Sequence, residues 1–207
     1  MSIQLQTGPM GHRLEHLCSV VAGERFLKME GYNEVPFFIC PHHPNETAQM
    51  ERLQRQLINR LEQSGIQLLE INLYDLSLQI LKDDGDFDYY VNEEPSLTKA
   101  KLLEDFQSIL DVEGVVIPRI AEQLGDNGYQ VLILSGVGEV FPYLRSHNIL
   151  NNLQKAAKTH PTLMFFPGTY THTLEHGASL DLFAPARKLT DDNDKYYRAY
   201  NIYEFEA

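Results

Sequence analysis

Four short apolar segments alternate with amphipathic segments along the chain. They comprise residues 35–40, 66–73, 129–135 and 162–166, and each is bounded by glycine, proline or polar residues. Short, nearly continuous apolar segments are typical of strands buried on both faces of a parallel sheet. Residues 129–135 form the strongest of them, and residues 200–205 add a final short strand, so the pattern predicts about five strands.

The segment between the first two strands has a helical pattern. Its apolar residues recur at spacings of three, four, one and three, which places them on one buried face: Met50, Leu53, Leu57, Ile58 and Leu61. Asn45 is a candidate cap at the start of this helix, and Gly65 is a candidate stop at its end. Strand, helix and strand in close succession predict a βαβ unit and therefore a parallel sheet.

Further helices are expected over residues 74–82, 96–110, 115–124 and from Pro142 to about residue 155, together with an N-terminal helical segment over residues 1–30. Residues 83–95 are predicted to be an acidic loop. The sequence thus predicts one α/β domain over residues 1–207, with a mainly parallel central sheet flanked by helices. The layering would be Rossmann-like or P-loop-like, but the chain has no Walker A motif, which excludes an ordinary P-loop ATPase.

Charge and cysteine content narrow the function. Of 207 residues, 17 are Lys or Arg and 29 are Asp or Glu, giving a formal net charge of −12. Proteins bind nucleic-acid backbones through clustered Lys and Arg, and a net negative charge repels the phosphates. We therefore expect no direct nucleic-acid binding. Cys18 and Cys40 are far apart, which favours free thiols in a reducing cytosol over a disulfide or a zinc site. No signal peptide or membrane span is evident, so we expect a cytoplasmic protein that does not enter a membrane.

The third strand ends in Gly136-Val137-Gly138, where an α/β sheet would place a ligand. Two glycines before a helix can let backbone N–H groups approach an anion. The third glycine of a dinucleotide-binding loop is missing, however, so a tight strand-to-helix turn is the favoured interpretation. The following helix carries an unusual set of polar residues: Arg145, His147, Asn148, Asn151 and Asn152. These side chains either hold adjacent loops or face a partner or ligand, and we favour the structural role.

One segment resembles a metal site. His172, Glu175 and His176 match the H-x-x-E-H pattern of inverted zinc proteases, which needs a stable helix. The segment lies between Pro167-Gly168 and Gly177, which leaves room for little more than one helical turn. We therefore expect a loop with no metal. Neither this segment nor any other contains a complete catalytic motif, so we expect no catalytic residues and no cofactor.

The C-terminal region offers a candidate interface. An acidic turn that contains Asp192 and Asn193 precedes Tyr196, Tyr197 and Arg198. Tyrosine and arginine dominate interface hot spots, so this segment can contact a partner. It can equally be an edge strand with its rings packed inward.

Three segments, residues 134–153, 164–170 and 189–202, resemble the BrxB family of bacteriophage-exclusion (BREX) defence systems. Relative to that family, residues 171–177 look like an insertion. The resemblance implies a cytosolic subunit that works with other BREX proteins to resist phage. We expect the direct partner to be PglZ, a protein resembling alkaline phosphatase. The family provides no catalytic residues to transfer to this chain.

The leading expectation is therefore a non-catalytic BREX subunit that acts through protein–protein interaction. The alternative is a nucleotide- or phosphate-binding regulatory protein or enzyme that uses the strand-end loops of residues 136–152. Either function draws on one candidate surface: Gly136, Gly138, Arg145, His147, Asn148, Asn151, Asn152, Pro167, Gly168, Tyr170, Asp192, Asn193, Tyr196, Tyr197 and Arg198.

Overall fold

The central sheet is mainly parallel, as the sequence predicts, and has six strands where about five were expected. A computed structural model describes residues 5–29, 37–125, 128–157, 160–173, 177–183 and 199–205. The strand order is β2-β3-β4-β1-β6, all parallel, and β5 pairs antiparallel with β4. The strands are β1 (Phe37–His42), β2 (Leu68–Asn72), β3 (Val131–Ser135), β4 (Thr162–Thr173), β5 (Gly177–Leu182) and β6 (Tyr200–Asn201).

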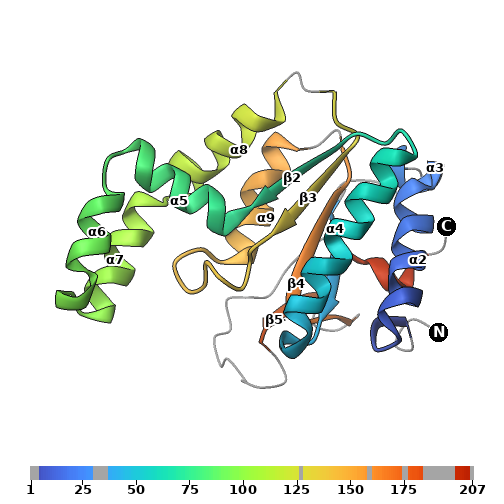
Figure 1. The fold of residues 1–207 in the computed structure, drawn as a ribbon, viewed down its shortest axis with the longest axis horizontal. Coiled ribbons are helices and arrows are strands. Elements are labelled where there is room, and N and C mark those ends of the chain that lie inside the picture. The colour runs from blue at the N-terminus through green and yellow to red at the C-terminus, as the bar shows by residue number, and fades with distance from the viewer. Residues whose placement is uncertain are drawn as a thin grey trace.

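Helices cover both faces of the sheet (Figure 1). The α-helices are α2 (Met10–Ala22), α3 (Glu24–Leu27), α4 (Thr47–Gln63), α5 (Leu73–Asp83), α6 (Phe87–Glu93), α7 (Lys99–Ile109), α8 (Ile117–Leu124) and α9 (Ser146–Ala156). Short helices of other types are η1 (Pro44–Glu46), η2 (Glu94–Ser96), η3 (Val112–Val116) and η5 (Ile202–Glu204). Helices α2 and α4 cover one face, while α5, α8 and α9 cover the other. Helices α6 and α7 extend beyond the sheet at the end opposite the termini.

Strand β3 separates the two hydrophobic cores. All five of its residues are buried, and their side chains alternate between the faces. Val131 and Ile133 pack with α2 and α4, whereas Leu132 and Leu134 pack with α5, α8 and α9. This confirms the prediction that residues 129–135 contain a central parallel strand.

The predicted βαβ unit is present, but its two strands are not neighbours. Strands β1 and β2 are joined by α4, and β4 and β3 lie between them in the sheet. Helix α4 buries Met50, Leu53, Leu57 and Leu61 as predicted, and Ile58 is half-buried. Gly65 ends this helix region with a φ of 83°, and the N–H of Ile66 donates to the carbonyl of Leu61.

Three predicted strand ends are wrong. The strand expected over residues 200–205 ends at Asn201 and is followed by η5. Pro41 lies inside β1, because β6 pairs only with Phe38 and Ile39 and leaves that side of β1 unpaired beyond them. Pro167 and Gly168 lie inside β4, which continues to Thr173 and pairs with β5. A Cβ atom on Gly168 would meet the carbonyl oxygen of Asp181, so glycine allows β5 to approach. The sequence pattern did not predict β5.

One predicted loop and the predicted starts of two helices also differ from the structure. The predicted acidic loop contains α6, because Phe87 packs under Lys82 and Tyr90 packs against Phe106 at 5.0 Å between ring centroids. The helix expected from Pro142 begins at Ser146, after a turned segment. Asn45 does not cap α4. Its own N–H instead donates to His43 Nδ1 at the start of η1.

Candidate functional site

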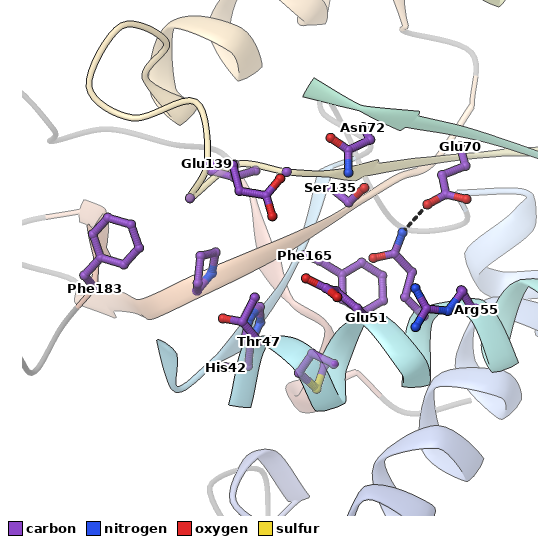
Figure 2. A pocket seen from close by; sticks show the side chains of 16 residues that line it. His42, Thr47, Glu51, Arg55, Glu70, Asn72, Ser135, Glu139, Phe165 and Phe183 are labelled. Atoms are coloured by element: carbon purple, nitrogen blue, oxygen red, sulfur yellow. Dashed lines mark hydrogen bonds between the residues drawn. The ribbon is translucent and has the colours of Figure 1, made fainter. Parts of the chain in front are cut away.

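A pocket of about 430 Å³ opens at the carboxyl ends of the parallel strands (Figure 2). His42 ends β1, Asn72 ends β2 and Ser135 ends β3, while Pro167 continues β4 at the same level. The registers pair Asn72 with Ser135 and His42 with Pro167, which brings these four residues to one edge of the sheet. This edge is where open parallel sheets bind ligands.

Helix α4 and the loop after β3 complete the pocket. The buried part of the lining is formed by Met50, Gln54, Val137, Phe165 and Pro167, together with the two strand-end residues His42 and Ser135. The outer part of the lining is formed by Thr47, Glu51, Arg55, Glu70, Asn72, Gly136, Gly138, Glu139 and Phe183. The pocket therefore has an apolar and uncharged floor beneath a charged rim.

Both glycines of the Gly136-Val137-Gly138 segment are explained by close packing. Gly136 has a φ of 73°, and a Cβ atom there would meet the side-chain oxygen of Asn72. A Cβ atom on Gly138 would lie 2.9 Å from Pro167 Cγ. Asn72 needs this room because its Oδ1 accepts the N–H groups of Tyr74, at 2.9 Å, and Asp75, at 3.2 Å, and so caps α5. These contacts support the interpretation of the segment as a tight turn.

Two buried polar atoms in the pocket have no hydrogen-bond partner among the described residues: His42 Nε2 and Ser135 Oγ. His42 is 3% exposed and Ser135 is 7% exposed. The other ring nitrogen of His42, Nδ1, lies 3.5 Å from the carbonyl oxygen of Cys40. Burial lowers the pKa of His42 to about 4, so its ring is neutral at physiological pH. In the tautomer in which Nδ1 is protonated and donates to the carbonyl oxygen of Cys40, Nε2 has a lone pair that can accept a hydrogen bond in the pocket.

The rim of the pocket is acidic. Glu51, Glu70 and Glu139 contribute three carboxylates, and Arg55 is the only Lys or Arg among the described lining residues. Burial raises the pKa of Glu139, and the negative charges of Glu51 and Asp75 raise it further. Burial also raises the pKa of Glu70, although Gln54 Nε2 donates to Glu70 Oε1 at 2.6 Å and acts in the opposite direction. The local field therefore favours a positive charge in the pocket.

The structure divides the predicted candidate surface. Gly136, Gly138 and Pro167 line the strand-end pocket, and Gly168 follows on β4. The hydroxyl of Tyr170 donates to the carbonyl of Ala199 and so has a structural role. Asp192, Asn193, Tyr196, Tyr197 and Arg198 lie outside the described residues.

The polar residues of α9 lie elsewhere. Arg145, Asn148 and Asn152 line a separate hollow of about 390 Å³ beside α7 and η3. Asn152 Nδ2 donates to the carbonyl of Asn148, which is an internal helix contact. Asn151 is exposed, His147 is half-buried, and neither lines the strand-end pocket.

The predicted zinc-like segment begins in a β-strand, and not in the expected loop or in the helix that its pattern needs. His172 and Thr173 are the last described residues of β4, and Gly177 begins β5. Residues 174–176, which include Glu175 and His176, lie outside the described ranges. Within those ranges, no three His, Cys, Asp or Glu side chains are grouped so that they could hold a metal ion.

Sequence reasoning did not identify six important lining residues as site residues: His42, Glu51, Glu70, Asn72, Ser135 and Glu139. A signal for three of them was available, because His42, Asn72 and Ser135 are polar residues close to the ends of apolar segments. Glu51 is indistinguishable in sequence from other exposed glutamates of α4. Its role depends on the loop after β3, which only the tertiary fold brings near.

A second surface lies at the opposite end of the molecule from the termini. We call α6 and α7 together the helical arm (Figure 1). A groove of about 430 Å³ runs between the arm and α5 and is lined mainly by apolar and aromatic side chains: Tyr74, Leu78, Leu81, Phe87, Tyr90, Val91, Leu102, Phe106, Leu110 and Tyr143. Neither helix of the arm has a buried residue. The arm thus presents apolar side chains that no other described part of the chain covers.

The family model for BREX protein BrxB matches residues 69–202, which is more than half of the chain and includes the helical arm. The chain belongs to the BrxB family. A family member from Bacillus cereus (strain H3081.97) is 31% identical over 93% of this chain and 97% of its own length. Another from Escherichia coli O9:H4 (strain HS) is 26% identical over 92% of this chain and 90% of its own length.

BrxB family membership makes the chain a subunit of a BREX phage-defence system. No solved structure matches it. Within the described ranges, no helix is long and apolar enough to cross a membrane.

Proposed function

We propose that this BREX subunit is non-catalytic and acts in the cytoplasm by binding another BREX protein, with a PglZ-type, alkaline-phosphatase-like component as the direct partner. The observation that carries the proposal is the helical arm, whose apolar side chains are left uncovered by the rest of the described chain. Large apolar side chains left open to solvent mark protein interaction sites when they form a continuous patch.

The arm combines packed aromatic rings with accessible contact residues. Tyr90, Phe106 and Tyr143 form a chain of edge-to-face rings, with centroid distances of 5.0 Å and 5.3 Å. Beside this chain, Tyr89 is 54% exposed and Val91 is 58% exposed. Aromatic residues held by packing lose little conformational entropy on binding, which suits them as interface anchors.

The charges around the arm indicate the chemistry of the partner. Most of the nearby charged side chains are acidic: Asp83, Asp84, Asp86, Asp88, Glu93 and Glu94. A complementary surface would have an apolar centre flanked by Lys and Arg. These acidic residues near the arm would also repel the phosphates of a nucleic acid, which argues against nucleic acid as the partner of this surface.

In the strand-end pocket, Ser135 and His42 are not arranged as a nucleophile and its base. A serine nucleophile needs a base within hydrogen-bond reach. Ser135 Oγ and His42 Nε2 both have no partner among the described residues, so the two side chains do not form a serine–histidine dyad. The two free cysteines are in keeping with a cytoplasmic location.

The test is a pull-down of the tagged full chain, co-expressed with the PglZ-type protein of its operon, at about 150 mM salt. We expect the wild type to retain the partner and Val91→Asp to weaken binding by about 30-fold, which corresponds to a hot spot of about 2 kcal/mol. Asn59→Asp is the matched control, because it adds the same charge at an exposed position of α4. Loss of binding in both variants, or in neither, would remove the arm as the contact surface. No retention by the wild type would refute the proposed partner.

A further inference from the structure

We propose that the pocket at the carboxyl ends of β1, β2 and β3 binds a small organic cation, an amine or guanidinium compound with an aliphatic stem. This site is separate from the helical arm, and the inference does not depend on the protein–protein interaction proposed above. It also differs from a phosphate or nucleotide site in the charge of the ligand.

The first support is the pair of unpartnered polar atoms on the floor of the pocket. His42 Nε2 and Ser135 Oγ are buried without a hydrogen bond among the described residues. Leaving such a buried group unsatisfied costs on the order of 1–3 kcal/mol, so native proteins rarely leave it without a role. Both atoms can accept a hydrogen bond, and a ligand that donates N–H groups would satisfy both.

The second support is the placement of the carboxylates. Glu139 and Glu51 lie on opposite walls of the pocket, one after β3 and the other on α4 (Figure 2). Glu70 already accepts a hydrogen bond from Gln54, whereas the structure shows no ion pair for Glu51 or Glu139 within the described ranges. A cation between these two walls would relieve their mutual repulsion, while a phosphate would add to it.

The third support is the shape and lining of the pocket. A volume of about 430 Å³ falls in the range of small-molecule sites. Met50 and Phe165 provide apolar contacts suited to a methylene stem. The glycines of the loop, which would be expected to cradle a phosphate in a nucleotide site, are explained by the packing of Asn72 and Pro167.

The experiment is calorimetric titration of the purified full chain with agmatine, which has an ammonium and a guanidinium group joined by a methylene stem. We expect saturation at one equivalent at about 150 mM salt. Glu139→Gln and Glu51→Gln should each weaken binding by about tenfold, because each removes one of the facing charges. Both residues are exposed, so neither variant should prevent folding.

Glu62→Gln is the matched control. Glu62 is an exposed glutamate on the same helix as Glu51, eleven residues away, or about 16 Å along the axis. The affinity of the Glu62→Gln variant for agmatine should lie within about twofold of the wild-type affinity. An equal loss in Glu62→Gln would show only general attraction to an acidic protein and would overturn the proposal.

Inorganic phosphate and ADP serve as anionic probes. The proposal fails if agmatine gives no saturable heat up to about 10 mM. It also fails if phosphate or ADP binds instead of agmatine and binds the Glu51→Gln variant more tightly than the wild type. Because Val91 lies in the arm and does not line the pocket, the outcome is separable from the pull-down.

Discussion

The guanidinium of Arg13 donates through Nε to the hydroxyl of Tyr203 across 3.1 Å, which joins the first described α-helix to the last described helical turn. The same guanidinium donates to Glu46 at 2.9 Å and to the sulfur of Met50 at 2.9 Å. Arg13 is fully buried. One cation thus connects α2, α4 and η5 on the face of the sheet that α2 and α4 cover.

We expect Arg13→Ala to lower the free energy of unfolding by about 2–4 kcal/mol, because it removes a large buried side chain and leaves Glu46 without its partner. Urea unfolding followed by circular dichroism measures the change. Lys28→Ala is the control, since it breaks the exposed ion pair with Glu24 and should cost at most about 0.5 kcal/mol. Similar losses of unfolding free energy in the two variants would show that the buried contacts of Arg13 stabilise the fold no more than an exposed ion pair does.

Gly136→Ala should destabilise the protein by about 2–4 kcal/mol, because the new methyl group would meet Asn72 and the backbone has a φ of 73°. Gly85→Ala isolates the backbone effect. Gly85 has a φ of 82° but no atom within 4 Å of an added Cβ, so it should lose only about 1 kcal/mol. Equal losses of stability in the two variants, measured by thermal unfolding, would mean that the Asn72 side chain moves aside at no cost.

His42 should make the protein less stable in acid. Burial lowers its pKa from 6.5 to about 4, an effect to which Arg13 and His43 add and which Cys40 and Glu46 oppose. Above pH 6.5 the ring is neutral in both states, whereas below it the unfolded chain binds the proton first. The contribution to stability is therefore lost as the pH falls from about 6.5 to about 4.

Between about pH 7 and pH 5, we expect this residue alone to account for a loss of about 2 kcal/mol. The measurement is urea unfolding of the wild type and His42→Gln at both pH values. Comparing the two proteins cancels the titration of the carboxylates. If the two lose the same stability on acidification, His42 is not the titrating group.

The two cysteines should differ in reactivity. Burial raises the pKa of Cys40 to about 11, so at about pH 8 only about one molecule in a thousand would carry the thiolate. Cys18 is half-buried. An aromatic disulfide reagent should therefore modify one thiol in the native protein and two after unfolding. In Cys18→Ser, the native protein should show no fast reaction, and a rapid one would contradict the burial of Cys40.

Local pattern was sufficient for most elements. The spacing from Met50 to Leu61 predicted α4, and the apolar segment ending at Ser135 predicted β3. The errors fall where tertiary contacts override local signals. Pro41 and Pro167 stay in strands because neighbouring strands hold the backbone, and Phe87 and Tyr90 turn an acidic segment into a helix by packing on α5 and α7.

The candidate site was predicted only in part for the same reason. The sequence indicated the carboxyl ends of the strands and the residues Gly136, Gly138 and Pro167, because strand ends can be located from local pattern. It could not place Glu51 opposite Glu139, since that pairing depends on where α4 lies relative to the loop after β3.

The amino-acid sequence by itself determined the α/β class, the parallel character of the sheet and the BrxB resemblance, because each depends on periodicity or on motifs within one segment. Only the tertiary structure decided the strand order β2-β3-β4-β1-β6, the β4–β5 hairpin, the strand-end pocket and the exposed helical arm. These features arise from contacts between residues far apart in the chain, such as Asn72 with Gly136 and Arg13 with Tyr203, which no local pattern encodes.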